Sequence, residues 1–371
     1  MPLPAPAVPG QPIADVDTPA LLLDLDRFER NLKTMAGAVR PLGVRLRPHA
    51  KSHKCAEIAQ RQIAAGAVGV CVQKTSEAEA LVAGGVQDVL VANEVVGRSK
   101  LARLAQLGKS ARIGVCVDDP DVVGDLDAAA RAAGSRLDVY IEVNVGANRC
   151  GVEPGEPALR LAQVVSGSGN LRLAGLQAYH GAAQHLRTIE ERRTAIAQAV
   201  EKTGRTRRLM EDEGLACDIV TGAGTGTFLY EGASGVYNEL QPGSYVFMDA
   251  DYNRNSWEGF PRFEQSLFIL ATVMSAPTAE RVVLDAGLKA HSFDSGMPQV
   301  VGWPGVEYAR PSDEHGVLKV AGGARAPRLG EKLRLVPGHC DPTVNLYDWL
   351  VCYRGERVEA VWPVTARGAF Y

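Results

Sequence analysis

The sequence predicts an α/β protein built as a (β/α)8 TIM-type barrel followed by a C-terminal, mainly β domain. Eight short apolar runs alternate with helical patterns between residues 44 and 247. The runs are mostly continuous in their apolar character, as expected for parallel strands that are buried on both faces. After about residue 255, strand-like runs follow one another without helical patterns between them. A doubly wound open sheet is the structural alternative, but eight units in about 210 residues fit the barrel better.

The first expected element is an apolar strand at residues 19–25. An amphipathic helix follows, in which apolar residues recur at helical spacing from Phe28 to Val39, and it ends near residues 41–43, which include a proline and a glycine. The eight barrel strands are then expected at 44–49, 68–73, 88–93, 112–117, 138–145, 173–179, 217–222 and about 239–247. Helices are expected between them at 54–65, 75–84, 98–109, 120–133, 157–166 and 187–213, whereas 223–238 carries little helical signal.

These elements divide the chain into three parts. Residues 1–25 form an N-terminal tail and a strand that we expect to pair with the C-terminal domain, residues 26–255 form the barrel, and residues 256–371 form the β domain. The β domain is expected to have strands at 267–273, 281–285, 332–336 and 359–364. Residues 1–10 are rich in proline and alanine and lack a charged region followed by an apolar core, so they predict a loose tail rather than a signal peptide.

The composition is that of an ordinary soluble globular protein, with 371 residues, 46% of them hydrophobic, and a formal net charge of −3. No basic excess indicates binding to nucleic acid or to an acidic membrane surface. No apolar run approaches the roughly 18–20 residues that a membrane helix needs. The seven cysteines are scattered and include no CxxC pair, which favours a reducing cytoplasm over a disulfide framework.

Polar residues collect where the predicted barrel strands end, and catalysis in such barrels takes place at that rim. The first strand stops at Pro48, and Lys51 follows it among other cations. A lysine in such a place can have a depressed pKa and form a Schiff base, although a solvated basic loop is the simpler alternative. The other strand ends carry Gln73, Asn93, Asp118, Asn144, Tyr179 and His180.

The seventh barrel strand leads into a turn rich in glycine and threonine at residues 221–226, which is suited to a phosphate. Glycine lets backbone N–H groups approach an anion, and Thr225 and Thr227 add hydroxyl donors. A second turn, 243–245, lies at the eighth strand. Each could also be only a turn. Arg149, just past the fifth strand, could bond a ring nitrogen or a carboxylate, or could be a surface arginine.

The sequence His339-Cys340-Asp341 is the sharpest feature of the β domain. On an extended segment, residues i and i+2 project to the same side, so His339 and Asp341 could bind one ion together. An imidazole and a carboxylate suit Mn²⁺, Zn²⁺ or a similar ion whose other positions are filled by water or substrate. A hydrogen-bonded His–Asp pair is the alternative.

Five motifs occur in order along the chain: 47–54 (Arg-Pro-His-Ala-Lys-Ser-His-Lys), 177–181 (Gln-Ala-Tyr-His-Gly), 221–226 (Thr-Gly-Ala-Gly-Thr-Gly), 313–316 (Asp-Glu-His-Gly) and 336–342 (Val-Pro-Gly-His-Cys-Asp-Pro). Together they resemble the D-threonine aldolases, which are pyridoxal 5'-phosphate (PLP) enzymes of fold type III with an alanine-racemase-type barrel. The wider group includes D-serine dehydratase and 3-hydroxyaspartate aldolase. The resemblance spans the chain from about Thr18 to Tyr371.

The resemblance implies a role for each candidate residue. Lys51 would form the Schiff base with PLP. The other residues expected to line or hold PLP are Gln73, Arg149 and Tyr179 around the ring and Gly224, Thr225, Gly226, Gly243 and Tyr245 at the phosphate. His339 and Asp341 would bind a divalent metal ion, with Mn²⁺ favoured and Mg²⁺, Co²⁺ or Zn²⁺ as alternatives. The catalytic base would be His185, His53 or metal-bound hydroxide.

The activity implied is retro-aldol cleavage of D-3-hydroxy amino acids of the D-threonine type to glycine and an aldehyde. Dehydratases of the group tend to have cysteine where this chain has Asp341, which favours an aldolase. The alternatives are a 3-hydroxyaspartate aldolase, in which His291 could meet the side-chain carboxylate, a D-serine or 3-hydroxyaspartate dehydratase, and a non-catalytic PLP carrier. The β domain argues against the carrier. The resemblance also implies a homodimer.

Overall fold

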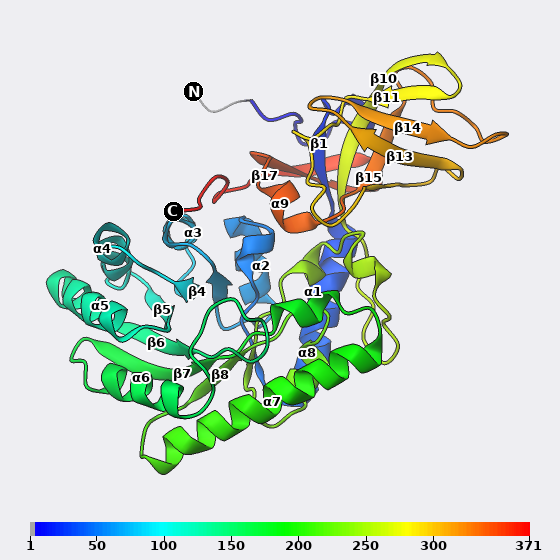
Figure 1. The fold of residues 1–371 in the computed structure, drawn as a ribbon. Coiled ribbons are helices and arrows are strands. Elements are labelled where there is room, and N and C mark those ends of the chain that lie inside the picture. Colours follow the sequence, from blue (N-terminus) through cyan, green and yellow to red (C-terminus); the bar gives the residue numbers. More distant parts are fainter. Residues whose placement is uncertain (1–3) are drawn as a thin grey trace.

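The computed structural model describes residues 4–371 and shows a parallel eight-stranded barrel beside a β domain (Figure 1). The barrel strands are β2 (Arg45–Leu46), β3 (Val70–Val72), β4 (Asp88–Glu94), β5 (Arg112–Val117), β6 (Leu137–Glu142), β7 (Leu171–Gln177), β8 (Ile219–Gly222) and β9 (Glu239–Leu240). They are ordered β2-β9-β8-β7-β6-β5-β4-β3. Backbone bonds from Val68 N–H to Leu46 O and from Cys71 N–H to Pro48 O, both 2.9 Å, join the two ends of this order. The predicted fold class is therefore confirmed.

Helices alternate with these strands as predicted: α1 (Leu25–Val39), α2 (Ala56–Ala64), α3 (Thr75–Ala83), α4 (Arg98–Leu107), α5 (Pro120–Ala133), α6 (Glu156–Ser166) and α7 (Ile189–Asp212), with the short α8 (Phe228–Gly232) in the link that carries little helical signal. Their ends follow local chemistry. The Asp119 side chain accepts two backbone N–H groups at the start of α5, and Gly134 ends that helix at φ +67°. Thr188 and Glu191 form a capping box at the start of α7.

The barrel interior is packed with side chains from successive strands, including Cys71, Leu90, Cys116, Tyr140 and Ile219. These side chains fill the barrel beneath the rim, so the space for a ligand lies above them at the strand ends. Gly175 in β7 has a φ of +144°, and a Cβ there would lie 1.9 Å from the carbonyl oxygen of Ile219 in β8. The close approach of these two strands therefore requires glycine.

The β domain is a nine-stranded sheet that includes the first strand of the chain. It comprises β1 (Ala20–Asp24), β10 (Leu267–Thr278), β11 (Arg281–Leu284), β12 (Gln299–Val300), β13 (Val306–Pro311), β14 (Gly316–Val320), β15 (Lys332–Val336), β16 (Trp349–Arg354) and β17 (Arg357–Pro363). Strand β1 lies between β10, which is antiparallel to it, and β16, which is parallel to it. Figure 1 shows β1, in blue, within the yellow-to-red β domain.

Two expectations for the terminal regions are wrong. The segment before β1 is not loose where it is described: the N–H of Gly10 donates to Val358 O at 2.8 Å, and Ala7 is buried. Residues 1–3 lie outside the described residues. The β domain also contains a short helix, α9 (Cys340–Val344), which the expectation of strands alone did not include. Figure 1 shows α9 where the β domain meets the barrel. The boundaries after residues 25 and 255 stay a prediction.

Within residues 4–371, the helices are all too short or too polar to cross a bilayer. All seven cysteines carry free thiols.

A buried cluster of charges stabilises the barrel near its closure. The Arg47 side chain, 3% exposed, donates to Glu239 in β9 at 2.9 Å and to Asp88 in β4 at 2.6 Å. We expect Arg47→Met to lower the free energy of unfolding by about 3–5 kcal/mol in urea titration, because it leaves the buried Glu239 without this partner. Arg30→Met, which breaks the exposed pair with Glu264, is the control and should cost at most about 1 kcal/mol. Equal effects of the two variants would contradict this account.

Candidate active site

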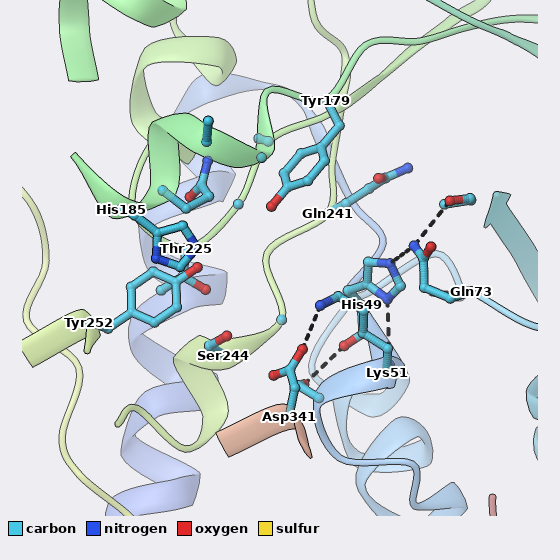
Figure 2. Close-up of a pocket in the computed structure, with 18 of the residues that line it drawn as sticks. His49, Lys51, Gln73, Tyr179, His185, Thr225, Gln241, Ser244, Tyr252 and Asp341 are labelled. Atoms are coloured by element: carbon cyan, nitrogen blue, oxygen red, sulfur yellow. Dashed lines mark hydrogen bonds and ion pairs between the residues drawn. The ribbon is translucent and has the colours of Figure 1, made fainter. Parts of the chain in front are cut away.

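A cavity of about 420 Å³ lies between the carboxyl ends of the barrel strands and α9 of the β domain. Its size suits a small-molecule ligand. Ten of the predicted site residues line it: Lys51, Gln73, Arg149, Tyr179, His185, Gly224, Thr225, Gly243, His339 and Asp341. Figure 2 shows Lys51 and Asp341 on one side of this space and His185 on another, with the Tyr179 hydroxyl directed into it.

Lys51 and Asp341 form an ion pair across the two domains. Lys51 lies in a single 3-10 turn after β2 (η3, Ala50–Ser52), and its Nζ is 2.5 Å from Oδ2 of Asp341. Burial opposes the charge on Lys51, but Asp341 outweighs it, so the pKa of Lys51 is raised. The depressed lysine pKa that the sequence suggested is therefore wrong for this arrangement. Burial likewise raises the pKa of Asp341, but Lys51 and His339 outweigh burial and lower it well below its usual value.

His339 and Asp341 both reach the cavity, but not by the geometry expected from the sequence. His339 is extended (φ −144°, ψ 125°) and occupies the N-cap position of α9, whereas Asp341 lies in the first helical turn. A carboxylate is favoured there because the helix dipole is positive at its N-terminus. The expectation of one extended segment is thus wrong. Nδ1 of His339 lies 2.7 Å from Oδ2 of Asp294, which leaves Nε2 as the ring nitrogen that could bind an ion.

This donor set is small for a metal ion. Across residues 4–371, the histidine, cysteine, aspartate and glutamate side chains form no group of three or more that could hold one. His339 and Asp341 alone would leave most positions to water or substrate, as in sites whose ion takes part in the reaction. An imidazole and a carboxylate are ligands that divalent ions accept, and Asp294 orients the His339 ring through Nδ1. The two residues therefore fit a divalent ion whose other ligands are water or substrate.

The turn after β8 places the Thr225 hydroxyl at the cavity wall, and hydrogen bonds to Tyr245 and Gln184 fix the turn on the side away from the cavity. The Thr225 hydroxyl accepts the N–H of Tyr245 at 3.1 Å, so its own hydrogen is free to point into the cavity. Ser244 lines the same wall. The N–H of Gly226 donates to Gln184 at 3.0 Å, and Tyr245 is buried with its hydroxyl bonded to Gln62. Gly226 and Tyr245 thus lie behind the cavity wall and shape it.

Amide, imidazole and aromatic groups form the opposite wall. Nε2 of Gln73 lies 2.7 Å from Nε2 of His49 and 3.0 Å from Ala92 O (Figure 2). Burial, with the nearby charge of Lys51, lowers the pKa of His49 well below its usual value, so this imidazole is neutral. The guanidinium of Arg149 lies 5.8 Å from the centre of the Tyr179 ring. A planar ligand in the cavity would therefore meet one cation and neutral donors on this side.

The two candidate histidine bases differ sharply in position. His185 lines the cavity, its side chain is 55% exposed, and its Nδ1 is 2.8 Å from Oδ2 of Asp251. His53 is fully buried outside the cavity, with Nε2 on Gln62 and Nδ1 accepting the N–H of Cys55. Burial lowers the pKa of His53 to about 4. Of the two histidines, only His185 therefore stays a candidate base.

Several lining residues were not given a site role from the sequence, although Gln177 and Ser244 lie in segments that it singled out: Gln177, Gln184, Ser244, Gln241, Asp249, Asp251 and Tyr252. Gln177 and Gln241 end or follow barrel strands, and reading the rim position by position could have found them. Asp249, Asp251 and Tyr252 come after the last barrel strand, where no sequence periodicity indicated a site. His291, considered for a substrate carboxylate, packs against Phe293 and Tyr308 and does not line the cavity.

Comparison with known proteins agrees with this architecture. The family model for the N-terminal domain of alanine racemase matches residues 23–251, and a putative serine dehydratase domain matches residues 266–353. D-threonine aldolase from Arthrobacter sp. is 52% identical, covering 99% of this chain and 97% of that protein. For 3-hydroxy-D-aspartate aldolase from Paracoccus denitrificans the identity is 46%, covering 99% and 96%.

The crystal structure of D-threonine aldolase from Filomicrobium marinum is 54% identical and superposes with a TM-score of 0.97, covering 100% of both chains. Identity at this level over complete chains extends through both the barrel and the β domain. The chain belongs to the D-threonine aldolase family of aldehyde-lyases, built on the alanine-racemase-type barrel.

Proposed function

We propose that this protein cleaves D-3-hydroxy amino acids of the D-threonine type to glycine and an aldehyde, using PLP and a divalent metal ion. The observation that carries the proposal is the meeting, in one cavity, of Lys51 from the barrel, His185 from the loop after β7, and His339 with Asp341 from the β domain. The 52% identity to the Arthrobacter D-threonine aldolase supports it.

The cavity chemistry fits both groups. Lys51 offers an amine, Thr225 and Ser244 offer hydroxyl donors for a phosphate, and Arg149 and Tyr179 offer a cation and an aromatic face for a ring. When bound, PLP supplies an electron sink for the charge left at the substrate Cα, and the metal ion supplies a Lewis acid for the 3-hydroxyl. Mn²⁺ is favoured.

The remaining chemistry belongs to the protein. Cleavage of the Cα–Cβ bond requires removal of the proton from the 3-hydroxyl. His185 is the exposed imidazole on the cavity wall, and its Nδ1 is engaged by Asp251, so Nε2 is the atom that receives this proton. Neutral His49 and the amide of Gln73 occupy the wall beside Lys51 without adding charge there.

Product analysis tests the reaction. Purified protein with PLP and Mn²⁺ is offered D-threonine and 3-hydroxy-D-aspartate in parallel, and we expect glycine and an aldehyde, faster from D-threonine. Faster cleavage of the second substrate would instead support a 3-hydroxyaspartate aldolase, which the Paracoccus relative makes the second candidate. Ammonia and a keto acid would identify a dehydratase, and PLP binding without product would identify a carrier.

The role of Lys51 is tested by spectroscopy. We expect Lys51→Ala to abolish the near-visible absorption band of PLP joined to the protein, because no other lysine amine lines the cavity in the described residues. Turnover should fall to background. Lys289→Ala removes an exposed lysine paired with Glu314 and is the control, which should keep the band. A band that survives in Lys51→Ala would exclude Lys51 as the anchoring residue.

Metal binding is tested without turnover, by titration of Mn²⁺ followed by electron paramagnetic resonance. We expect His339→Ala to abolish measurable binding and Asp294→Asn to weaken it about 10–100-fold, since Asp294 orients the His339 ring. Exposed Asp313→Asn serves as the control. Unchanged Mn²⁺ affinity in His339→Ala would show that the metal ion does not bind at His339.

The homodimer and the cytoplasmic location are proposed on the family resemblance and the composition. Sedimentation at several protein concentrations checks the first.

A further inference from the structure

The loop that carries His185 is hydrogen-bonded to the segment that leads into the β domain. The loop comprises residues 181–188 and the segment residues 249–256. The Nδ2 of Asn255 donates to Gln184 O at 3.0 Å, and the N–H of Ser256 donates to Arg187 O at 2.9 Å. The fully buried Arg192 side chain joins both, with bonds to Leu186 O and Ser256 O.

Asp251 is the central side chain of this connection. It is 6% exposed, and its two carboxylate oxygens have separate partners. Oδ2 lies 2.8 Å from Nδ1 of His185, while Oδ1 accepts from Arg187 at 2.6 Å and also from Arg254. Its backbone N–H donates to Gly338 O at 3.2 Å, one residue before His339. Asp251 thus contacts both the imidazole of His185 and the backbone next to His339.

The carboxylate of Asp251 is ionised at neutral pH. Burial raises the pKa of Asp251, but hydrogen bonds from Arg187, His185 and Arg254 outweigh it and lower the pKa to about 2. An ionised carboxylate only accepts hydrogen bonds. Whenever the contact with Oδ2 is made, Nδ1 of His185 must therefore carry hydrogen, and in the neutral ring Nε2 must then hold the lone pair.

We propose that Asp251 is a positioning residue for His185: it fixes the Nδ1–H tautomer and the ring orientation that present Nε2 to the cavity as the proton acceptor. The proposal rests on the proposed function, in which His185 takes the proton of the 3-hydroxyl. The proton moves from the substrate oxygen to Nε2 while the carboxylate of Asp251 stays ionised and stabilises the imidazolium.

Asp251→Asn makes a sharp test, because the two arginines require an oxygen at the Oδ1 position. The amide NH₂ then faces His185, donates to Nδ1 and selects the opposite tautomer. We expect kcat to fall at least about 10²-fold with KM, the PLP absorption band and Mn²⁺ affinity within about twofold of wild type. The D251N/H185Q double variant should be no slower than H185Q alone, because Asp251 acts through His185.

Two further variants separate positioning from folding. Asp251→Glu keeps an acceptor-only carboxylate and should retain at least about tenfold more of kcat than D251N; equal losses would make the role structural and overturn the proposal. Asp138→Asn is the matched control, since Asp138 is also held by two arginines, Arg112 and Arg172, but lies outside the cavity. It should leave kcat unchanged.

A direct measurement does not depend on any Asp251 variant. In protein labelled with ¹⁵N-histidine, nitrogen shifts recorded at a pH of about 8.5 report the tautomer of His185, whose signals are assigned by their absence in H185Q. Nδ1–H in the wild type is expected, and Nε2–H would overturn the proposal. A wild type that cleaves neither substrate overturns the proposed function and the proton-transfer role together, whereas an active D251N overturns only the positioning role.

Discussion

The ion pair between Lys51 and Asp341 is the contact on which the site depends. It joins the first strand end of the barrel to α9 of the β domain, and it brings together the amine and one of the carboxylates to which the proposed function assigns roles. Each charge is held partly out of water and is stabilised by the other. Because Asp341 contacts the ammonium of Lys51, any chemistry that consumes this amine also leaves Oδ2 of Asp341 without its cationic partner. The two halves of the site are electrostatically linked.

The barrel and most of its rim could be predicted from the sequence because both follow from local pattern. Continuously apolar runs indicate buried parallel strands, and a parallel barrel places all strand ends at one face. Lys51, Tyr179 and Thr225 were therefore expected together although they are far apart in the chain. The order of the motifs then indicated the family, which the comparisons confirmed. Individual roles within the cavity stay predictions.

The parts that sequence reasoning missed depend on tertiary contacts. Helix α9 has only five residues, too few for a periodic pattern, so His339 and Asp341 were placed on one extended segment. The raised pKa of Lys51 depends on Asp341, 290 positions later in the chain. The contact of Asp251 with His185 likewise joins two irregular segments, where propensity and hydrophobic pattern carry no information about pairing.

The placement of β1 has a consequence for the order in which the molecule can be made. On the ribosome, β1 emerges before any barrel strand, yet it is hydrogen-bonded between β10 and β16, and β16 ends at Arg354. Leu21 and Leu23 of β1 are fully buried in the folded protein. They therefore lack their partners in β10 and β16 while the barrel is synthesised. Pairing of β1 with β16 also completes the sheet that carries α9, so the nascent chain has no assembled site until β16 has been synthesised.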